Sequence, residues 1–355
     1  MPPKRRPDGG YGDRGGDMRF DAVLGEPFAT VPEQAATAER LGYAGVHATE
    51  LTHDPFLTCT LATTGTRTAD VGTQIAVAFA RNPMSVAVAA RDLQDLSGGR
   101  FVLGLGTQVE AHITRRFSMP WGPPAERIAE FVRAVRAIWQ AWEGDGRLRF
   151  QGEHYRHTLM TPAFSPGPAP NGLPPVHLAA VGARMAETAG AVADGVIAHV
   201  FCTPRYLEEV VAPAAARGLT REGRDRDGFA VVAPAFVVTG RDDAERAAAA
   251  AAVRAQIAFY GSTPAYRGVL EIDGRGNLAD RLHELSVSRD PARWAAMAAL
   301  VDDEVLASFA VVAERAADVP GLLRQRYDGL ADRVVLGVPS GVDRGGWLEA
   351  IGSVA

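Results

Sequence analysis

The chain has 355 residues, of which 47% are hydrophobic and 22% charged, with a formal net charge of −5 at pH 7. This composition predicts a globular protein with one large core, and no apolar run reaches the roughly 20 residues of a membrane span. Arginines are interspersed with acidic residues, so no basic stripe points to nucleic acid, and we expect a small-molecule partner.

The two cysteines indicate a reducing compartment. Cys59 and Cys202 lie far apart in the chain and fit no metal-ligand spacing. We therefore expect a cytoplasmic protein without a structural metal.

Residues 1–17 combine proline, glycine and charge with almost nothing to bury. They also lack the apolar segment of a secretory signal. The sequence predicts a disordered tail over 1–17 and one domain over 18–355.

From residue 19 on, short apolar runs alternate with helical patterns, which indicates parallel strands joined by crossover helices. A closed (β/α)8 TIM barrel contains eight parallel strands. It is an α/β fold whose strands are buried on both faces. An open doubly wound sheet is the alternative. The predicted strands are 19–24, 44–48, 71–79, 101–105, 176–180, 195–199, 229–238 and 333–338.

Polar residues follow several of these runs directly. Enzymes with a (β/α)8 barrel place their chemistry on the loops after the strands. We therefore predict that Thr49, Glu50 and His53 lie at the barrel mouth, together with residues 107–112 and His199.

The carboxylates at the predicted mouth leave two interpretations open. Glu50 and Glu110 could act as a general acid and base, as in glycoside hydrolysis. Alternatively, each pairs with a nearby arginine or caps a helix. The histidines of this region show no HxxxH or HExxH spacing, so no metal site is predicted.

The fifth run ends in AAVGARMAETAG, residues 179–190. Gly182 stands where the strand turns into a helix, whose first N–H groups and dipole favour an anion, and Arg184 is adjacent. The segment predicts a phosphate site, although a glycine at such a turn also occurs for structural reasons. It is neither GxGxxG nor a Walker loop.

Three segments carry a family resemblance: VGTQIAVAFARNP (71–83), LSGGRFVLGLGTQVEAH (96–112) and VGARMAETAGAVADGV (181–196). Together they resemble the luciferase-like monooxygenase superfamily, in its bacterial branch that uses the deazaflavin coenzyme F420. The likeness extends from about residue 19 to 338. Members of this superfamily are (β/α)8 barrels with insertions that bind a flavin or deazaflavin at the mouth.

The resemblance implies a cofactor site, residue by residue. Members have a non-proline cis bond in the third strand against the cofactor ring, and the matching bond here joins Gln74 and Ile75. Thr49, Glu50 and Thr107 match positions that border the ring. The segment around the coenzyme phosphates matches Val181, Gly182, Ala183 and the neighbouring Arg184.

The resemblance also bears on proton transfer. Glu110 matches the position where a related sugar-phosphate dehydrogenase has an active-site acid. The histidine of that dehydrogenase is absent here, because Leu51 follows Glu50. His53 or His112 could take its place, so the catalytic candidates are Glu50, His53, Glu110 and His112.

The leading hypothesis is an F420-dependent oxidoreductase that exchanges a hydride with a small organic substrate. The alternatives are a reduced-FMN monooxygenase, a non-catalytic flavin-binding barrel, or a hydrolase that uses Glu50 and Glu110. Insertions at 146–174, a predicted hairpin and loop, and at about 260–290, a predicted loop, should shape the substrate pocket. Family barrels commonly form homodimers, which we expect here.

Overall fold

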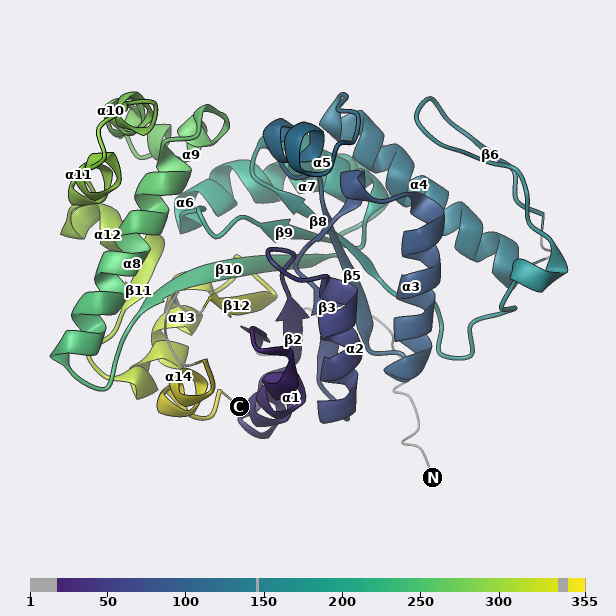
Figure 1. Ribbon diagram of the computed structural model, residues 1–355, viewed down its shortest axis with the longest axis horizontal. Coiled ribbons are helices and arrows are strands. Elements are labelled where there is room, and N and C mark those ends of the chain that lie inside the picture. Colours follow the sequence, from purple (N-terminus) through teal and green to yellow (C-terminus); the bar gives the residue numbers. More distant parts are fainter. Residues whose placement is uncertain (1–17, 145–146, 338–343, 355) are drawn as a thin grey trace.

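The computed structural model describes residues 18–144, 147–337 and 344–354, and it confirms the predicted (β/α)8 barrel (Figure 1). β12 pairs with β1 and with β10, and β10 also pairs with β9, so the parallel sheet closes on itself. The predicted tail, residues 1–17, lies outside the described residues. The barrel strands are β1 (Arg19–Val23), β2 (Gly45–Ala48), β3 (Asp70–Thr73) continuing in β4 (Ala76–Val77), β5 (Phe101–Gly106), β8 (Val176–Ala180), β9 (Gly195–Ala198), β10 (Ala230–Val238) and β12 (Arg333–Gly337).

Two strand details differ from the prediction. The third run is interrupted between Thr73 and Ala76, and its end at 78–80 is a 3-10 helix. A further strand, β11 (Ala310–Val312), pairs in parallel with the end of β10. Its three residues are too few to form an apolar run that stands out from the helix before it.

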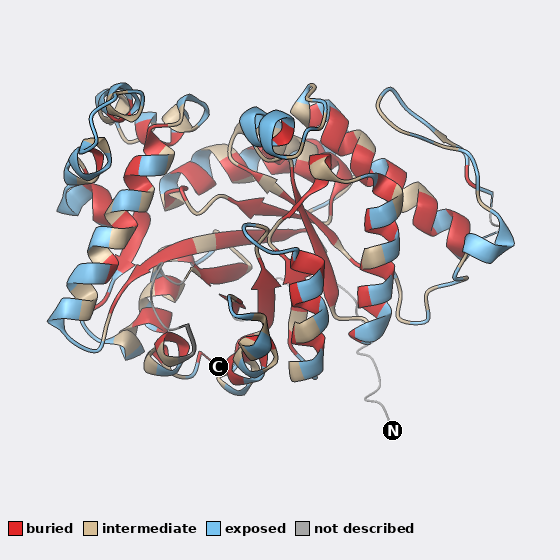
Figure 2. Ribbon diagram, in the orientation of Figure 1, coloured by how far each residue is buried: buried red, intermediate tan, exposed pale blue. Residues whose placement is uncertain are grey.

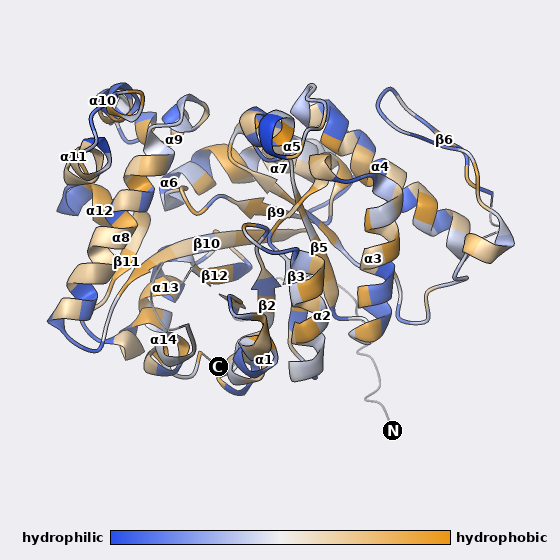
Figure 3. Ribbon diagram, in the orientation of Figure 1, coloured by the Kyte–Doolittle hydropathy of each residue, from blue (hydrophilic) through white to orange (hydrophobic). Residues whose placement is uncertain are grey.

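Helices surround the barrel and cover its strands, which are buried along nearly their whole length (Figure 2). β10 is coloured hydrophobic along most of its length (Figure 3). Of the described helices, none has the length and apolarity to cross a membrane. The helices that follow the strands are α1 (Val31–Arg40), α2 (Pro55–Gly65), α3 (Pro83–Leu96), α4 (Pro124–Glu143), α5 (Ala183–Val192), α7 (Ala212–Arg221), α8 (Asp243–Gly261), α13 (Val319–Tyr327) and α14 (Arg344–Ile351).

The first predicted insertion contains an antiparallel hairpin, formed by β6 (Phe150–Gln151) and β7 (Arg156–His157). The carboxylate of Glu130 on α4 accepts hydrogen bonds from the backbone N–H groups of Glu153, His154 and Tyr155. The hairpin is thus fixed to α4 and lies at the edge of the molecule (Figure 1).

The loop predicted for residues 260–290 is wrong, because most of this segment is helical. It comprises the end of α8, a 3-10 turn (Pro264–Tyr266), α9 (Arg267–Glu271) and α10 (Gly276–Ser286). Leu278, Leu282 and Leu285 fall three and four residues apart, so α10 has the apolar stripe of an amphipathic helix. Two further short helices, α11 (Arg293–Ala299) and α12 (Asp303–Phe309), follow it.

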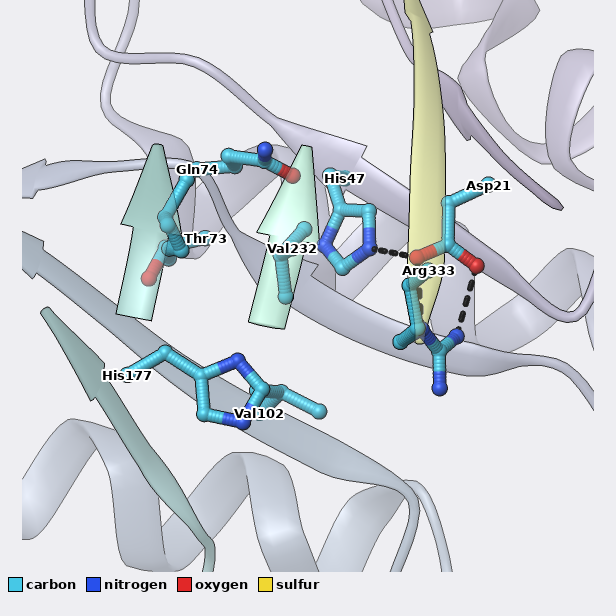
Figure 4. Close-up of a pocket in the computed structure, with 9 residues that line it drawn as sticks. Asp21, His47, Thr73, Gln74, Val102, His177, Val232 and Arg333 are labelled. Atoms are coloured by element: carbon cyan, nitrogen blue, oxygen red, sulfur yellow. Dashed lines mark hydrogen bonds and ion pairs between the residues drawn. The ribbon is translucent and has the colours of Figure 1, made fainter. Parts of the chain in front are cut away.

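A buried charge network ties the last barrel strand to the first three, and Figure 4 shows its contacts with the first two. Nε and Nη2 of Arg333 on β12 donate to Asp21 on β1 at 2.7 and 2.6 Å. His47 Nε2 on β2 lies 2.9 Å from Asp21, and Arg333 Nη1 donates to Asp70 on β3 at 2.8 Å. A Cβ on Gly45 would stand 2.6 Å from Arg333 Nη2, so only glycine leaves room for this contact.

The network keeps Asp21 ionised although its side chain has no exposed surface. Burial alone raises the pKa of Asp21. The charge of Arg333 and hydrogen bonds from His47 and Arg333 outweigh burial and hold that pKa well below its ordinary range.

Replacement of Asp21 by Asn should lower the free energy of unfolding by about 3–5 kcal/mol, because it leaves Arg333 buried without its main partner. In the wild type, the contribution of Asp21 is fully present above its unfolded pKa of about 4 and decreases as the pH falls below that value. Urea unfolding from about pH 7 to about pH 3 measures both effects.

Asp318→Asn is the matched control, since Asp318 pairs with Arg315 on the surface. It should leave the free energy of unfolding nearly unchanged. Equal losses in the two variants would contradict a special role for the buried network.

Candidate functional site at the barrel mouth

The barrel interior is layered. A polar floor of Asp21, His47, Arg333 and His177 surrounds a cavity of about 10 Å³ that Gln74 also lines (Figure 4). The apolar interior cluster consists of Ile197, Ala230, Val232 and Val335, with Val23, Ile75 and Ala179 packed against it.

Strand periodicity determines which residues face the interior at the mouth. Side chains two positions apart on a strand share a face. The interior side at the mouth is therefore occupied by the residues two positions after inward-facing ones. These are Thr49 after His47, Gln74 after Gly72, Val181 after Ala179, and His199 after Ile197.

Strand register places these residues in adjacent pairs. Ala48 pairs with Thr73, so Thr49 and Gln74 are the next residues on neighbouring strands. Ala180 pairs with Ala198, so Val181 and His199 are neighbours in the same way. The register thus makes two of the predicted cofactor residues, Thr49 and Gln74, neighbours, and it makes a third, Val181, a neighbour of His199.

The cis peptide bond expected between Gln74 and Ile75 is confirmed. The Ile75 side chain lies against Gly106 at the end of β5, where a Cβ would stand 2.8 Å from its carbons. Thr107 comes next, half-buried, and its hydroxyl donates to the Gln108 carbonyl at 3.1 Å. The segments predicted to hold a cofactor ring therefore meet between β4 and β5, which pair in parallel.

Both carboxylate oxygens of Glu50 accept hydrogen bonds. The Val77 N–H donates to it at 2.7 Å, and Arg81 Nη1 forms an ion pair with it at 2.6 Å, while the side chain is only 8% exposed. The structure thus shows the arginine pairing that was one of the two interpretations, and Glu50 braces the segment after β2 against that after β4. Its catalytic role stays a prediction.

The other three proton-transfer candidates are exposed, His53 on the loop after β2 and Glu110 and His112 in the helical segment after β5. His53 Nε2 is 3.1 Å from Glu26, and its ring packs on Phe28 at 4.3 Å. Glu110 and His112 are exposed where a π-helix, His112–Arg116, begins after β5. No recorded contact within the described residues joins these candidates to one another.

The predicted phosphate turn is open to a ligand. Gly182 is the N-cap of α5, and no described side chain caps the helix there. A Cβ on Gly182 would meet no described atom within 4 Å. Arg184 is exposed and paired with Glu126 on α4, beside a groove of about 860 Å³ between α4 and α5.

His199 is a mouth residue to which the sequence analysis assigned no role. Its Nδ1 accepts a hydrogen bond from the Phe201 N–H at 3.0 Å, and the rings of Tyr260 and Tyr266 lie 4.7 and 5.0 Å from its own. The two-residue spacing from Ile197 is the signal that could have placed it on the interior face.

The described part of the chain contains no group of three His, Cys, Asp or Glu side chains that could hold a metal ion. Cys59 and Cys202 are buried and free. Burial raises the pKa of both thiols, that of Cys202 to about 12, so neither is an activated nucleophile.

The chain is similar to a known protein family and to several individual proteins. The luciferase-like monooxygenase family matches residues 4–333. An uncharacterized protein of Mycobacterium tuberculosis is 51% identical over 318 residues, which cover 90% of this chain and 92% of the relative. The F420-dependent glucose-6-phosphate dehydrogenase of Mycolicibacterium smegmatis is 34% identical over 185 residues, 50% of this chain and 52% of that protein.

One solved structure illustrates the similarity of fold. The coenzyme F420-dependent tetrahydromethanopterin reductase from Methanopyrus kandleri superposes with a TM-score of 0.77 at 22% sequence identity. The match covers 95% of this chain and 97% of that protein. At this identity the likeness shows a common fold.

Proposed function

The chain belongs to the luciferase-like monooxygenase family, and we propose that it is an F420-dependent oxidoreductase that transfers a hydride between the coenzyme and a small organic substrate. Two similar proteins carry coenzyme F420 in their names, one of them a dehydrogenase and the other a reductase. The observation that carries coenzyme binding is the uncapped, open turn at Gly182, next to the mouth, and the names of the similar proteins favour F420 as the coenzyme.

This turn suits the phosphate of a coenzyme. The N–H groups that open α5 and the helix dipole attract an anion, and the missing side chain at Gly182 lets it approach the backbone. Val181, Gly182 and Ala183 would bind through their backbone. Arg184 would add charge, shared with Glu126.

The remaining mouth residues would hold the ring. A reduced deazaflavin supplies a hydride when bound. Thr49, Gln74, Ile75 and Thr107 would position it from the ends of adjacent strands. The apolar layer beneath, which includes Ile197 and Val232, keeps water from the inner side of the mouth.

A reduced-FMN monooxygenase is the alternative, since the family takes its name from that chemistry. Both coenzymes carry a phosphate, so the turn at Gly182 serves either one. Fluorescence titration of the purified protein with F420 and with FMN separates the two functions. Tighter binding of F420 supports the proposal, and selective binding of FMN would overturn it.

Replacement of Gly182 by Val should weaken F420 binding about 10-fold or more, because the side chain fills the approach to the backbone N–H groups. Gly182 has an extended conformation with φ of −96°, and the free protein has room for the new side chain. The melting temperature should therefore not change. Equilibrium titration with F420 and a thermal melt measure the two quantities.

Gly321→Val on α13 is the control, since a Cβ there also meets no described atom within 4 Å. It should leave F420 binding intact. If the Gly182 variant binds F420 with unchanged affinity, the coenzyme phosphate does not bind at this turn.

The variants Glu110→Gln and His112→Ala should leave F420 affinity and melting temperature nearly unchanged, because both side chains are exposed. If either residue moves the proton that accompanies the hydride, turnover should fall by about 10² to 10⁴. The assay requires any donor or acceptor that exchanges hydride with bound F420.

Glu50→Gln provides the contrast, since it weakens the ion pair to Arg81 and should lower the melting temperature. Turnover within a few-fold of wild type in both exposed variants would assign proton transfer to another group.

A further inference from the structure

We infer that His199, with Tyr260 and Tyr266, forms a substrate subsite that binds an uncharged, ring-bearing molecule through an acceptor oxygen. The identification of that molecule as the substrate rests on the proposed function. The subsite itself can be tested without the coenzyme.

The subsite lies inside the mouth. His199 directly follows β9 on the interior side, and register places it beside Val181, where the predicted coenzyme turn begins. A ligand held at His199 is thus adjacent to the turn that would bind the coenzyme phosphate.

The hydrogen-bonding role of His199 is fixed by its backbone neighbour. Phe201 N–H donates to Nδ1 at 3.0 Å, so Nδ1 carries no proton and the neutral ring has its hydrogen on Nε2. No described group accepts from Nε2. The ring is only partly buried, so this N–H is a donor available to a ligand.

Two tyrosine rings pack against the ring that carries this donor. The Tyr260 ring stands edge-on to His199, with an interplanar angle of 86°, and the Tyr266 ring is tilted by 47°. Phe201 packs behind them and stacks on Phe309 at 4.5 Å. Both tyrosines come from the 260–290 insertion, so that segment does contribute to the mouth.

Electrostatics determine the class of ligand. Burial lowers the pKa of His199 to about 4, and no charged group among the described residues adds to that shift. Burial also raises the pKa of Tyr260 and of Tyr266, so both phenols are neutral. The subsite offers one neutral donor beside aromatic rings, which suits a carbonyl oxygen on a ring better than a phosphate or carboxylate.

Three probes of similar shape test this inference by isothermal titration calorimetry on the full chain, with and without F420. Acetophenone has a ring and an acceptor oxygen, ethylbenzene lacks the acceptor, and benzoate carries a charge. We expect acetophenone to bind about 3- to 10-fold more tightly than ethylbenzene, as one hydrogen bond allows. Benzoate should bind more weakly than acetophenone.

His199→Phe keeps a ring and removes the donor, so acetophenone should lose its advantage while ethylbenzene binds as before. His157→Phe, on the outer hairpin, should retain the preference. A preference that survives in the His199 variant, or stronger binding of benzoate, would overturn the inference.

Side-chain ¹⁵N NMR of wild-type His199 provides a check that needs no variant. The protein should show the Nε2–H tautomer, and acetophenone should shift that signal. An Nδ1–H tautomer or an unchanged signal would overturn the inference. Acetophenone binding without any F420 binding would leave the subsite standing and overturn the proposed function alone.

Discussion

Arg333 and Asp21 form a buried, doubly hydrogen-bonded pair between residues 312 positions apart in the chain. The pair joins the last barrel strand to the first, and His47 and Asp70 extend it to the next two strands. A parallel barrel has no hairpin to align its seam, so closure depends on contacts between distant segments. Two charges with almost no exposed surface are tolerated only when they are paired and hydrogen-bonded, which makes this register hard to shift.

The strand register also determines which side chains face inward at the barrel mouth. Once the floor residues face inward, the two-residue period of each strand determines which side chains face inward at the carboxyl end. Thr49 and Gln74 then lie side by side, as do Val181 and His199. The helix that begins at Gly182 points its N-terminus toward the same end. The proposed coenzyme turn, the proposed ring-contacting positions and the proposed aromatic subsite all lie where this one strand arrangement puts them.

Much of this arrangement could be predicted from the sequence, because strands buried on both faces read as continuous apolar runs. The strand positions and the polar strand ends followed from that pattern. The pairing of Glu50 with Arg81 could not, since it joins loops about 30 residues apart and either residue could have faced solvent. The helical segment at 260–290 was missed because its glycines concealed the leucine spacing of α10. The spacing from Ile197 could place His199 on the interior side, but its proposed role also depends on tyrosines from that same distant segment.

The central claim is that the carboxyl end of this barrel holds a deazaflavin coenzyme between the ends of β2, β3 and β5 and the turn after β8. A crystal structure of the full chain with bound F420 tests it most directly. We expect the phosphate within hydrogen-bond distance of the backbone N–H groups of residues 182–184, with the ring against Gln74 and Ile75. Coenzyme bound instead in the groove between α4 and α5, with the mouth empty, would contradict it.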